Sequence, residues 1–234
     1  MATTTITADV FEGGEQHDNT YQNARRAAQT SSTYTRPYVG QTTGSGYTVE
    51  RSALCFDLSG LPSGITVNSA NLKVYVRNDN STTDFDFYGC EATVDCSSIW
   101  TNTMFNDFTG WADSDSAFTP TYYTVAQNTN GISTAAYTDI ALTATGKSKI
   151  EDLAGGATKM KFIMLSAEDI SASAPSDSES LQFYDVGDSD KEPGLYIDYT
   201  EASGYGNKVS TVLSANIGSI SGIPTANIDK VSGV

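Results

Sequence analysis

The chain has one histidine and 28 acidic side chains with which to do acid–base chemistry. His17 stands in the polar stretch QHDN, residues 16–19. A serine or cysteine triad needs a histidine that a partner orients, and a surface-loop histidine is the simpler interpretation here. A carboxylate pair for glycoside hydrolysis needs only Asp or Glu, but no particular pair stands out. We therefore predict no catalytic residues and expect that the protein is not an enzyme.

Two acidic runs offer the oxygen ligands that calcium prefers. Residues 185–192 read DVGDSDKE and residues 113–115 read DSD. Neither run matches the EF-hand loop, so solvated turns are the simpler interpretation, and no His/Cys cluster for zinc is present in the sequence. We expect no cofactor or resident metal and keep calcium as an alternative.

The three cysteines, Cys55, Cys90 and Cys96, form an odd set without the spacing of a disulfide framework. We expect free thiols, made and kept in a cytosol. A bridge between Cys90 and Cys96 is the alternative.

Aromatic side chains suggest the one ligand class that the sequence favours, carbohydrate. Flat aromatic rings with polar tips suit the faces of pyranose rings. The candidate glycan-binding residues are Trp100, Trp111, Tyr122 and Tyr123. The simpler interpretation is that the tryptophans cover an end of the sandwich.

Composition and charge exclude several classes of partner. The formal net charge of −15 argues against nucleic acid, whose binding depends on Lys and Arg. No apolar stretch approaches the roughly 18 residues of a membrane span. The start, residues 1–6, has neither a basic region nor an apolar run, so we expect no secretory signal there.

Short alternating stretches separated by turn residues predict strands, and the 24 aromatic residues can furnish a sizeable core. The predicted strands are 3–11, 50–58, 67–76, 84–90, 121–126, 137–142, 159–167, 181–184 and 195–200. A polar loop is expected up to residue 46 and an irregular aromatic segment over 97–120. Residues 147–153 are the one helix candidate. This pattern predicts an all-β antiparallel sandwich with one short helix and an extended C-terminal tail. The expected core residues are Leu54, Phe56, Leu72, Val74, Phe162 and Ile197.

Two adjoining runs resemble a known family. Residues 51–59 read RSALCFDLS, and residues 61–76 read LPSGITVNSANLKVYV. They resemble the DNRLRE domain, a family of jelly-roll modules akin to some carbohydrate-binding modules. The resemblance covers roughly residues 3–200, through ITADVF at 6–11 and EPGLYIDYT at 192–200, and implies a jelly-roll fold more than a function. The family often has Arg where Cys55 stands, so any role of that arginine does not carry over.

The end of the chain repeats one nine-residue phrase with a period of eleven. Residues 215–223 read ANIGSISGI and residues 226–234 read ANIDKVSGV. The three-residue spacing of the apolar positions fits neither a half-buried strand nor an amphipathic helix, so the tail cannot bury them itself. The predicted docking residues are Ile217, Ile220, Ile223, Ile228, Val231 and Val234. The phrase resembles the C-terminal tails of some tailed-phage structural proteins.

These features divide the chain into a sandwich domain, residues 1–200, and a docking tail, residues 201–234. We predict a non-enzymatic phage virion protein, a head decoration or fibre-like accessory subunit, made in the host cytoplasm. Its expected partners are other virion proteins through the tail, further copies of itself, and a polysaccharide bound weakly. A tail or neck component of the virion is one alternative. A carbohydrate-binding or adhesin module of a secreted, extracellular bacterial protein is the other.

Overall fold

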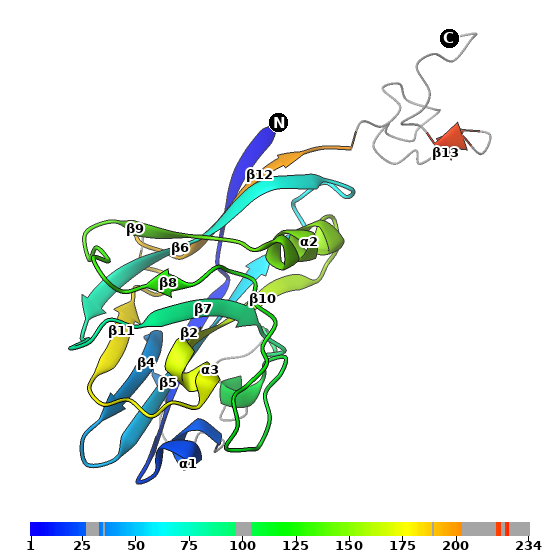
Figure 1. Ribbon diagram of the computed structural model, residues 1–234. Coiled ribbons are helices and arrows are strands. Elements are labelled where there is room, and N and C mark those ends of the chain that lie inside the picture. Colours follow the sequence, from blue (N-terminus) through cyan, green and yellow to red (C-terminus); the bar gives the residue numbers. More distant parts are fainter. Residues whose placement is uncertain are drawn as a thin grey trace.

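The computed structural model describes residues 1–26, 36–96, 104–188 and 190–202, and the backbone alone of 33–34, 219–220 and 223–224. Antiparallel strands form two layers that face each other across an apolar interior (Figure 1). The predicted all-β sandwich is therefore confirmed. Among the helices within these ranges, none has the length and apolar character needed to cross a membrane.

The first layer has a long strand at its centre. It consists of β1 (Ala2–Thr7), β12 (Gly194–Thr200), β6 (Thr66–Asp79) and β9 (Tyr137–Ala141). In this layer β12 pairs with β1 on one side and β6 on the other. The last strand of the sandwich is thus an internal strand of the layer.

The second layer is built on the central strand β5. It consists of β2 (Val10–Asp18), β5 (Tyr47–Asp57), β10 (Lys159–Ser166), β7 (Asp86–Glu91) and the short β8 (Gln127–Asn128). The two layers are joined by β11 (Glu179–Phe183) and β4 (Tyr38–Thr43), which pair with β6 and β5 respectively. The two-residue strand β3 (Thr33–Tyr34) pairs antiparallel with β2.

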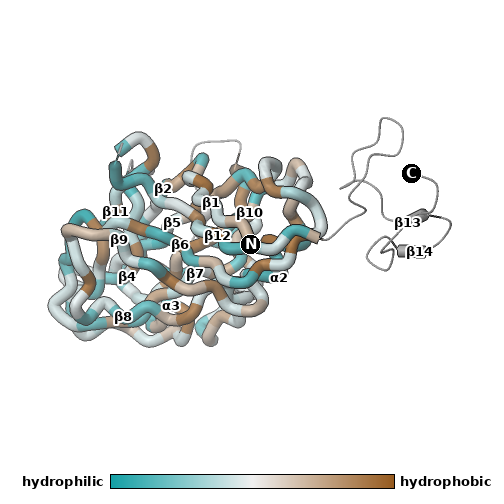
Figure 2. Tube along the Cα trace, turned by 90° about the horizontal axis from the view of Figure 1, so that it is seen from above, coloured by the Kyte–Doolittle hydropathy of each residue, from teal (hydrophilic) through white to brown (hydrophobic). Residues whose placement is uncertain are grey.

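Alternation along the strands produces the main core between the layers. The predicted core residues Leu54, Phe56, Leu72, Val74, Phe162 and Ile197 are all 0% exposed, which confirms the predicted register. Phe56 and Phe162 meet edge to face, with ring centroids 5.7 Å apart. Hydrophobic and hydrophilic residues are interleaved along the chain, as this alternation requires (Figure 2).

A second core covers the opposite face of β5, which the sequence analysis did not foresee. Its aromatic residues are Tyr21, Phe105, Phe108 and Phe118, from α1 (Tyr21–Arg26), η1 (Met104–Asn106) and the irregular segment after it. Beneath them lie Ala53 and Cys55 of β5 and Ile163 of β10. As a result β5 is buried on both faces.

A disulfide crosslinks this second core and corrects the expectation of free thiols. Cys55 on β5 is bonded to Cys96, with the two Cα atoms 6.0 Å apart. Cys90 is the free cysteine and is buried, so the alternative bridge between Cys90 and Cys96 is also wrong. Burial raises the pKa of the Cys90 thiol, which keeps it protonated and unreactive.

The described residues contain three short helices rather than the one predicted. The predicted helix 147–153 is α2 (Ala144–Leu153), where the hydroxyl of Thr143 accepts a hydrogen bond from Gly146 N. Gly155, with φ of 75°, follows its end. The helix α3 (Ala167–Ser171) follows β10 directly, with Ser166 as its N-cap.

The predicted polar loop up to residue 46 is wrong in large part. It contains the second half of β2, the helix α1 and the strand β4. Likewise the predicted strand 3–11 is divided between β1 and β2. The predicted strand 121–126 is wrong, because only isolated bridges at Tyr122 and Thr124 occur there, and the two-residue strand β8 follows.

Candidate binding face of the sandwich

The predicted glycan-binding residues do not form one surface. Tyr123 is 1% exposed and donates a hydrogen bond from its hydroxyl to Glu91 Oε1 at 2.6 Å, so it is a core residue. Tyr122 is 38% exposed and packs edge to face on Tyr88. Trp111 is partly buried against the second core, and its indole nitrogen is enclosed. Trp100 lies outside the described residues.

The predicted docking residues lie mainly outside the described part of the chain, namely Ile217, Ile228, Val231 and Val234. Ile220 and Ile223 are described by their backbone only. They pair across a two-stranded hairpin of β13 (Ser219–Ile220) and β14 (Ile223–Pro224).

The side chains of His17 and of the acidic run 185–192 contact other groups of the protein. The ring Nδ1 of His17 lies 3.2 Å from Thr48 Oγ1 on the surface. The carboxylates of Asp185, Asp188 and Glu192 accept hydrogen bonds from backbone N–H groups of their own turn. Within the described ranges, no three His, Cys, Asp or Glu residues come close enough together to hold a metal ion.

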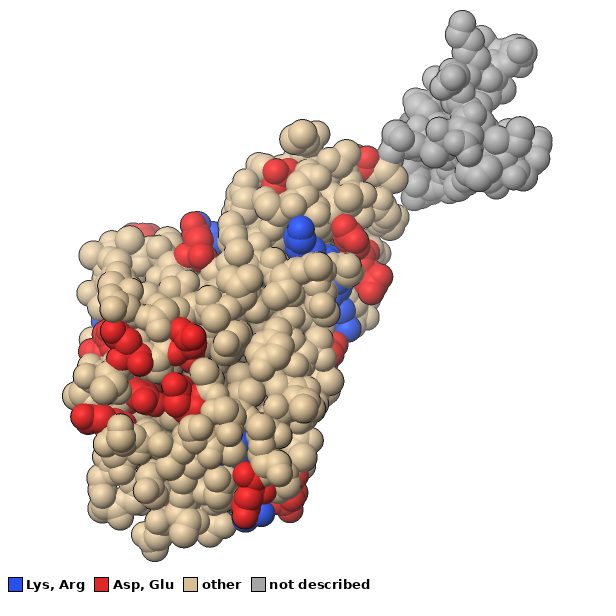
Figure 3. All heavy atoms as spheres, viewed as in Figure 1, with Lys and Arg blue, Asp and Glu red and all other residues tan. Residues whose placement is uncertain are grey.

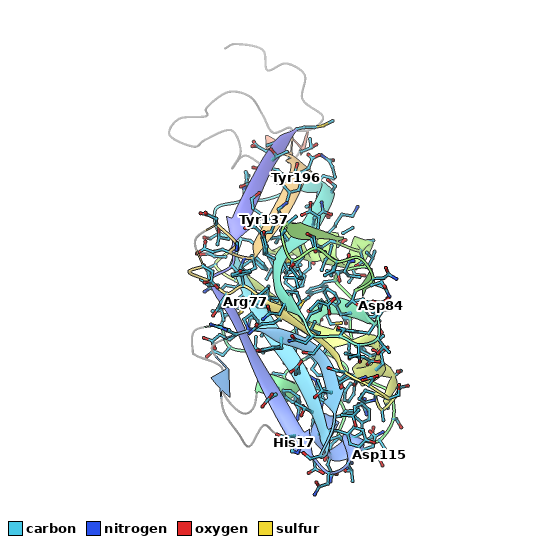
Figure 4. The ribbon with its side chains drawn as sticks, turned by 90° about the vertical axis from the view of Figure 1, so that its left-hand side faces the viewer. His17, Arg77, Asp84, Asp115, Tyr137 and Tyr196 are labelled. Carbon is cyan, nitrogen blue, oxygen red and sulfur yellow. A yellow bond between two sulfur atoms is a disulfide. The ribbon has the colours of Figure 1, made fainter. Side chains whose placement is uncertain are left out.

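A group of tyrosines interleaved with cations occupies the outer face of the first layer. Tyr75 packs edge to face against Tyr137 at 5.2 Å and against Tyr184 at 5.4 Å between ring centroids. Lys191 Nζ lies 4.1 Å from the ring centroid of Tyr184, and Arg77 flanks the same ring. We call this group, with Lys73 and Tyr196, the tyrosine face. Tyr196, Tyr137 and Arg77 follow one another along one side of the sandwich, with His17 near its far end (Figure 4).

The tyrosine face contains a hollow of about 270 Å³. Its lining residues are Thr5, Thr7, Lys73, Tyr137, Asp190, Glu192 and Gly194. Strand register places Thr7, Gly194, Lys73 and Asp139 in one row across β1, β12, β6 and β9. Because Gly194 has no side chain, that row has a gap between Thr7 and Lys73. The hollow is therefore a consequence of one glycine in a layer whose neighbouring outward positions carry side chains.

A second concavity, the polar groove, lies between α2 and the ends of β7 and β10. It measures about 200 Å³ and includes Glu91, Lys149, Lys159 and Lys161 in its lining. The charged side chains of the groove form ion pairs within the protein. Lys149 pairs with Glu91 at 3.0 Å, and Lys159 pairs with Asp9 at 3.1 Å. Lys161 donates to the carbonyl of Val94 at 2.7 Å. Although burial raises the pKa of Glu91, the hydrogen bonds from Tyr123, Lys149 and Thr109 outweigh it and lower that pKa overall. These internal partners favour a structural role for the groove.

Two buried polar clusters also have structural explanations. Asp169 is 1% exposed and pairs with both Arg51 and Arg25, whose side chains are 0% exposed. Glu50, 8% exposed, accepts a hydrogen bond from Ser180 Oγ. Burial raises the pKa of Glu50 to about 7, and nearby Glu15 adds to the effect. Neither cluster contains a nucleophile with a poised base.

The tyrosine face is not visible in the sequence, because its members come from three strands and from the loop between β11 and β12. One local signal was available. The alternation of β6 that points Leu72 and Val74 inward points Lys73, Tyr75 and Arg77 outward, which is an aromatic ring between two cations on an exposed face. The gap at Gly194 becomes visible only once β12 is placed beside β6.

No protein-family model matches this chain, and no curated protein does either.

Proposed function

We propose that this protein is a non-enzymatic structural subunit of a phage virion, a head decoration or fibre-like accessory protein fastened by its C-terminal tail. The observation that carries the proposal is the position of β12. This strand ends at Thr200, is paired on both sides, and completes the first layer before the repeat begins. The first layer is therefore complete without the six apolar residues of the repeat. A second surface is the natural place to bury them.

The surface chemistry supports a displayed particle protein. Acidic side chains gather on one flank of the sandwich, and Lys and Arg appear beside α2 together with further acidic side chains (Figure 3). A net charge of −15 favours solubility at high copy number on a particle. The disulfide between Cys55 and Cys96 suits a protein that functions outside the cell, because disulfides persist in oxidising surroundings.

Two observations test this proposal. The neighbouring genes should include those for terminase, portal and capsid proteins. Antibodies raised against the sandwich should label purified phage particles at regular positions in immunogold electron microscopy. A gene set around a signal-bearing hydrolase, together with unlabelled particles, would contradict the proposal. Label on the tail or neck instead of the head would favour that alternative location.

The second candidate is a carbohydrate-binding or adhesin module of a secreted protein. The tyrosine face is the observation in its favour, because exposed aromatic rings beside polar groups suit sugar rings. The same face on a virion would supply weak adhesion, which many copies strengthen by roughly 10²–10⁴-fold through avidity.

A further inference from the structure

We propose that the hollow over Gly194 is a binding site for one ring of a neutral saccharide. This inference rests on the glycan-adhesion part of the proposed function and is independent of how the tail is anchored. It also moves the predicted glycan site away from Trp111 and Tyr122, to the outer face of the first layer.

The shape of the site comes from strand register. The next row of outward positions across the same four strands contains Thr5, Tyr196, Asn71 and Ala141. Each of these residues carries a side chain. Gly194 leaves the adjacent row open at its centre. A Cβ atom built on Gly194 would lie 3.1 Å from Thr5 Cγ2, so a side chain at this position would crowd the methyl group of Thr5.

The wall of the site is an aromatic ring held in one orientation. Tyr137 is 36% exposed, and its hydroxyl lies 3.0 Å from the carbonyl oxygen of Asp190 and 3.1 Å from that of Glu192. Tyr75 supports its ring from the side, and Lys73 Nζ lies 5.4 Å from its centroid. A ring fixed at both ends can bind a ligand with little loss of conformational entropy.

The polar groups match the hydroxyl-rich rim of a sugar. Among the lining residues, Thr5 and Thr7 carry hydroxyls that can both donate and accept. Asp190 and Glu192 carry carboxylates, and Glu192 Oε1 accepts a hydrogen bond from Gly187 N. One aromatic wall with several convergent polar groups is the composition expected of a small-ligand site. The volume of about 270 Å³ suits one sugar ring rather than a larger ligand.

The charges select a neutral ligand. Among the lining residues that the structure describes, Lys73 is the one cation, and its Nζ is already 2.8 Å from Asp139 Oδ1. The carboxylates of Asp190 and Glu192 therefore leave the site with excess negative charge. An acidic saccharide would be repelled, whereas neutral hydroxyls can donate to these carboxylates.

The test is a glycan array probed with the full chain as a streptavidin tetramer, which supplies avidity. The array holds neutral probes (glucans, mannans and galactans) and acidic probes (polygalacturonate and alginate). We expect binding to at least one neutral class, with acidic probes weaker. An array without a neutral binder, or one on which acidic probes bind best, would overturn the proposal.

Variants locate the site once a neutral binder is known. Tyr137→Ala removes the wall and Gly194→Val fills the hollow, and each should weaken binding about fivefold or more, since an aromatic contact contributes about 1 kcal/mol. Tyr122→Ala is the matched control, because Tyr122 is a tyrosine 38% exposed that lies outside the tyrosine face. Unchanged melting temperatures establish that the variants fold. Binding that survives both Tyr137→Ala and Gly194→Val, or that is lost instead in Tyr122→Ala, would contradict this site. None of these results depends on incorporation into a particle.

Discussion

Arg51 Nε donates to Asp169 Oδ2 at 2.7 Å, and neither side chain is more than 1% exposed. This pair joins the central strand β5 to α3 inside the second core. Arg51 Nη2 donates to Asp169 Oδ1 at 2.9 Å as well. Other donations from its guanidinium reach the carbonyls of Phe105 and Arg25 and the side chain of Asn106. One arginine thus attaches the irregular aromatic segment and α1 to the sheet.

Replacement of Asp169 tests that role. Asp169→Asn leaves two buried guanidinium groups without a counter-charge, and loss of one partner of a buried pair costs about 3–5 kcal/mol. Chemical denaturation should show this loss in the free energy of unfolding. The control is Asp9→Asn, which breaks the half-exposed pair with Lys159 and should cost no more than about 1 kcal/mol. Equal effects of the two substitutions would contradict the structural role of Asp169.

The disulfide should contribute strongly to stability. Cys55 and Cys96 are 41 residues apart in sequence, and closing a loop of that length is worth about 4 kcal/mol in the chain-entropy model. We expect reductant, or the double substitution Cys55→Ala with Cys96→Ala, to lower the free energy of unfolding by roughly this amount. Reductant should have no further effect on the double variant. Peptide mapping that places Cys90 in the bond would refute the assignment.

Glu50 should make stability fall as pH rises. Its folded-state pKa of about 7 lies above the ordinary value of 4.5, so the folded protein keeps a proton that the unfolded chain has released. Between about pH 4.5 and 7 the unfolded state binds fewer protons, and stability decreases by about 3 kcal/mol across this window. Glu50→Gln removes this loss.

The measurement is the difference in unfolding free energy between Glu50→Gln and the wild type. It should be near zero at pH 4 and reach about 3 kcal/mol in favour of the variant at pH 8. A difference that does not change with pH would show that the Glu50 carboxyl is not perturbed.

Alternation alone located the main core, because a strand between two layers must point every second side chain inward. Leu54 and Phe56 on β5 were identified in this way. The other face of β5 was missed, since alternation cannot show that a second layer of irregular chain will cover Arg51, Ala53 and Cys55. The disulfide escaped prediction for the same reason, because Cys55 meets Cys96 only beneath that cover. The hollow at Gly194 depends on pairing among four strands, which no local pattern encodes.

We propose that the C-terminal repeat fastens a self-sufficient sandwich to a particle. The most direct measurement is the number of copies per purified particle, determined by quantitative mass spectrometry, for the full chain and for a chain lacking residues 215–234. A full-length control with the residues of the repeat in shuffled order keeps its length and composition. We expect both altered chains to melt at the wild-type temperature, to be absent from particles, and to remain in the soluble fraction. Incorporation of the shortened chain at the wild-type copy number would contradict this proposal.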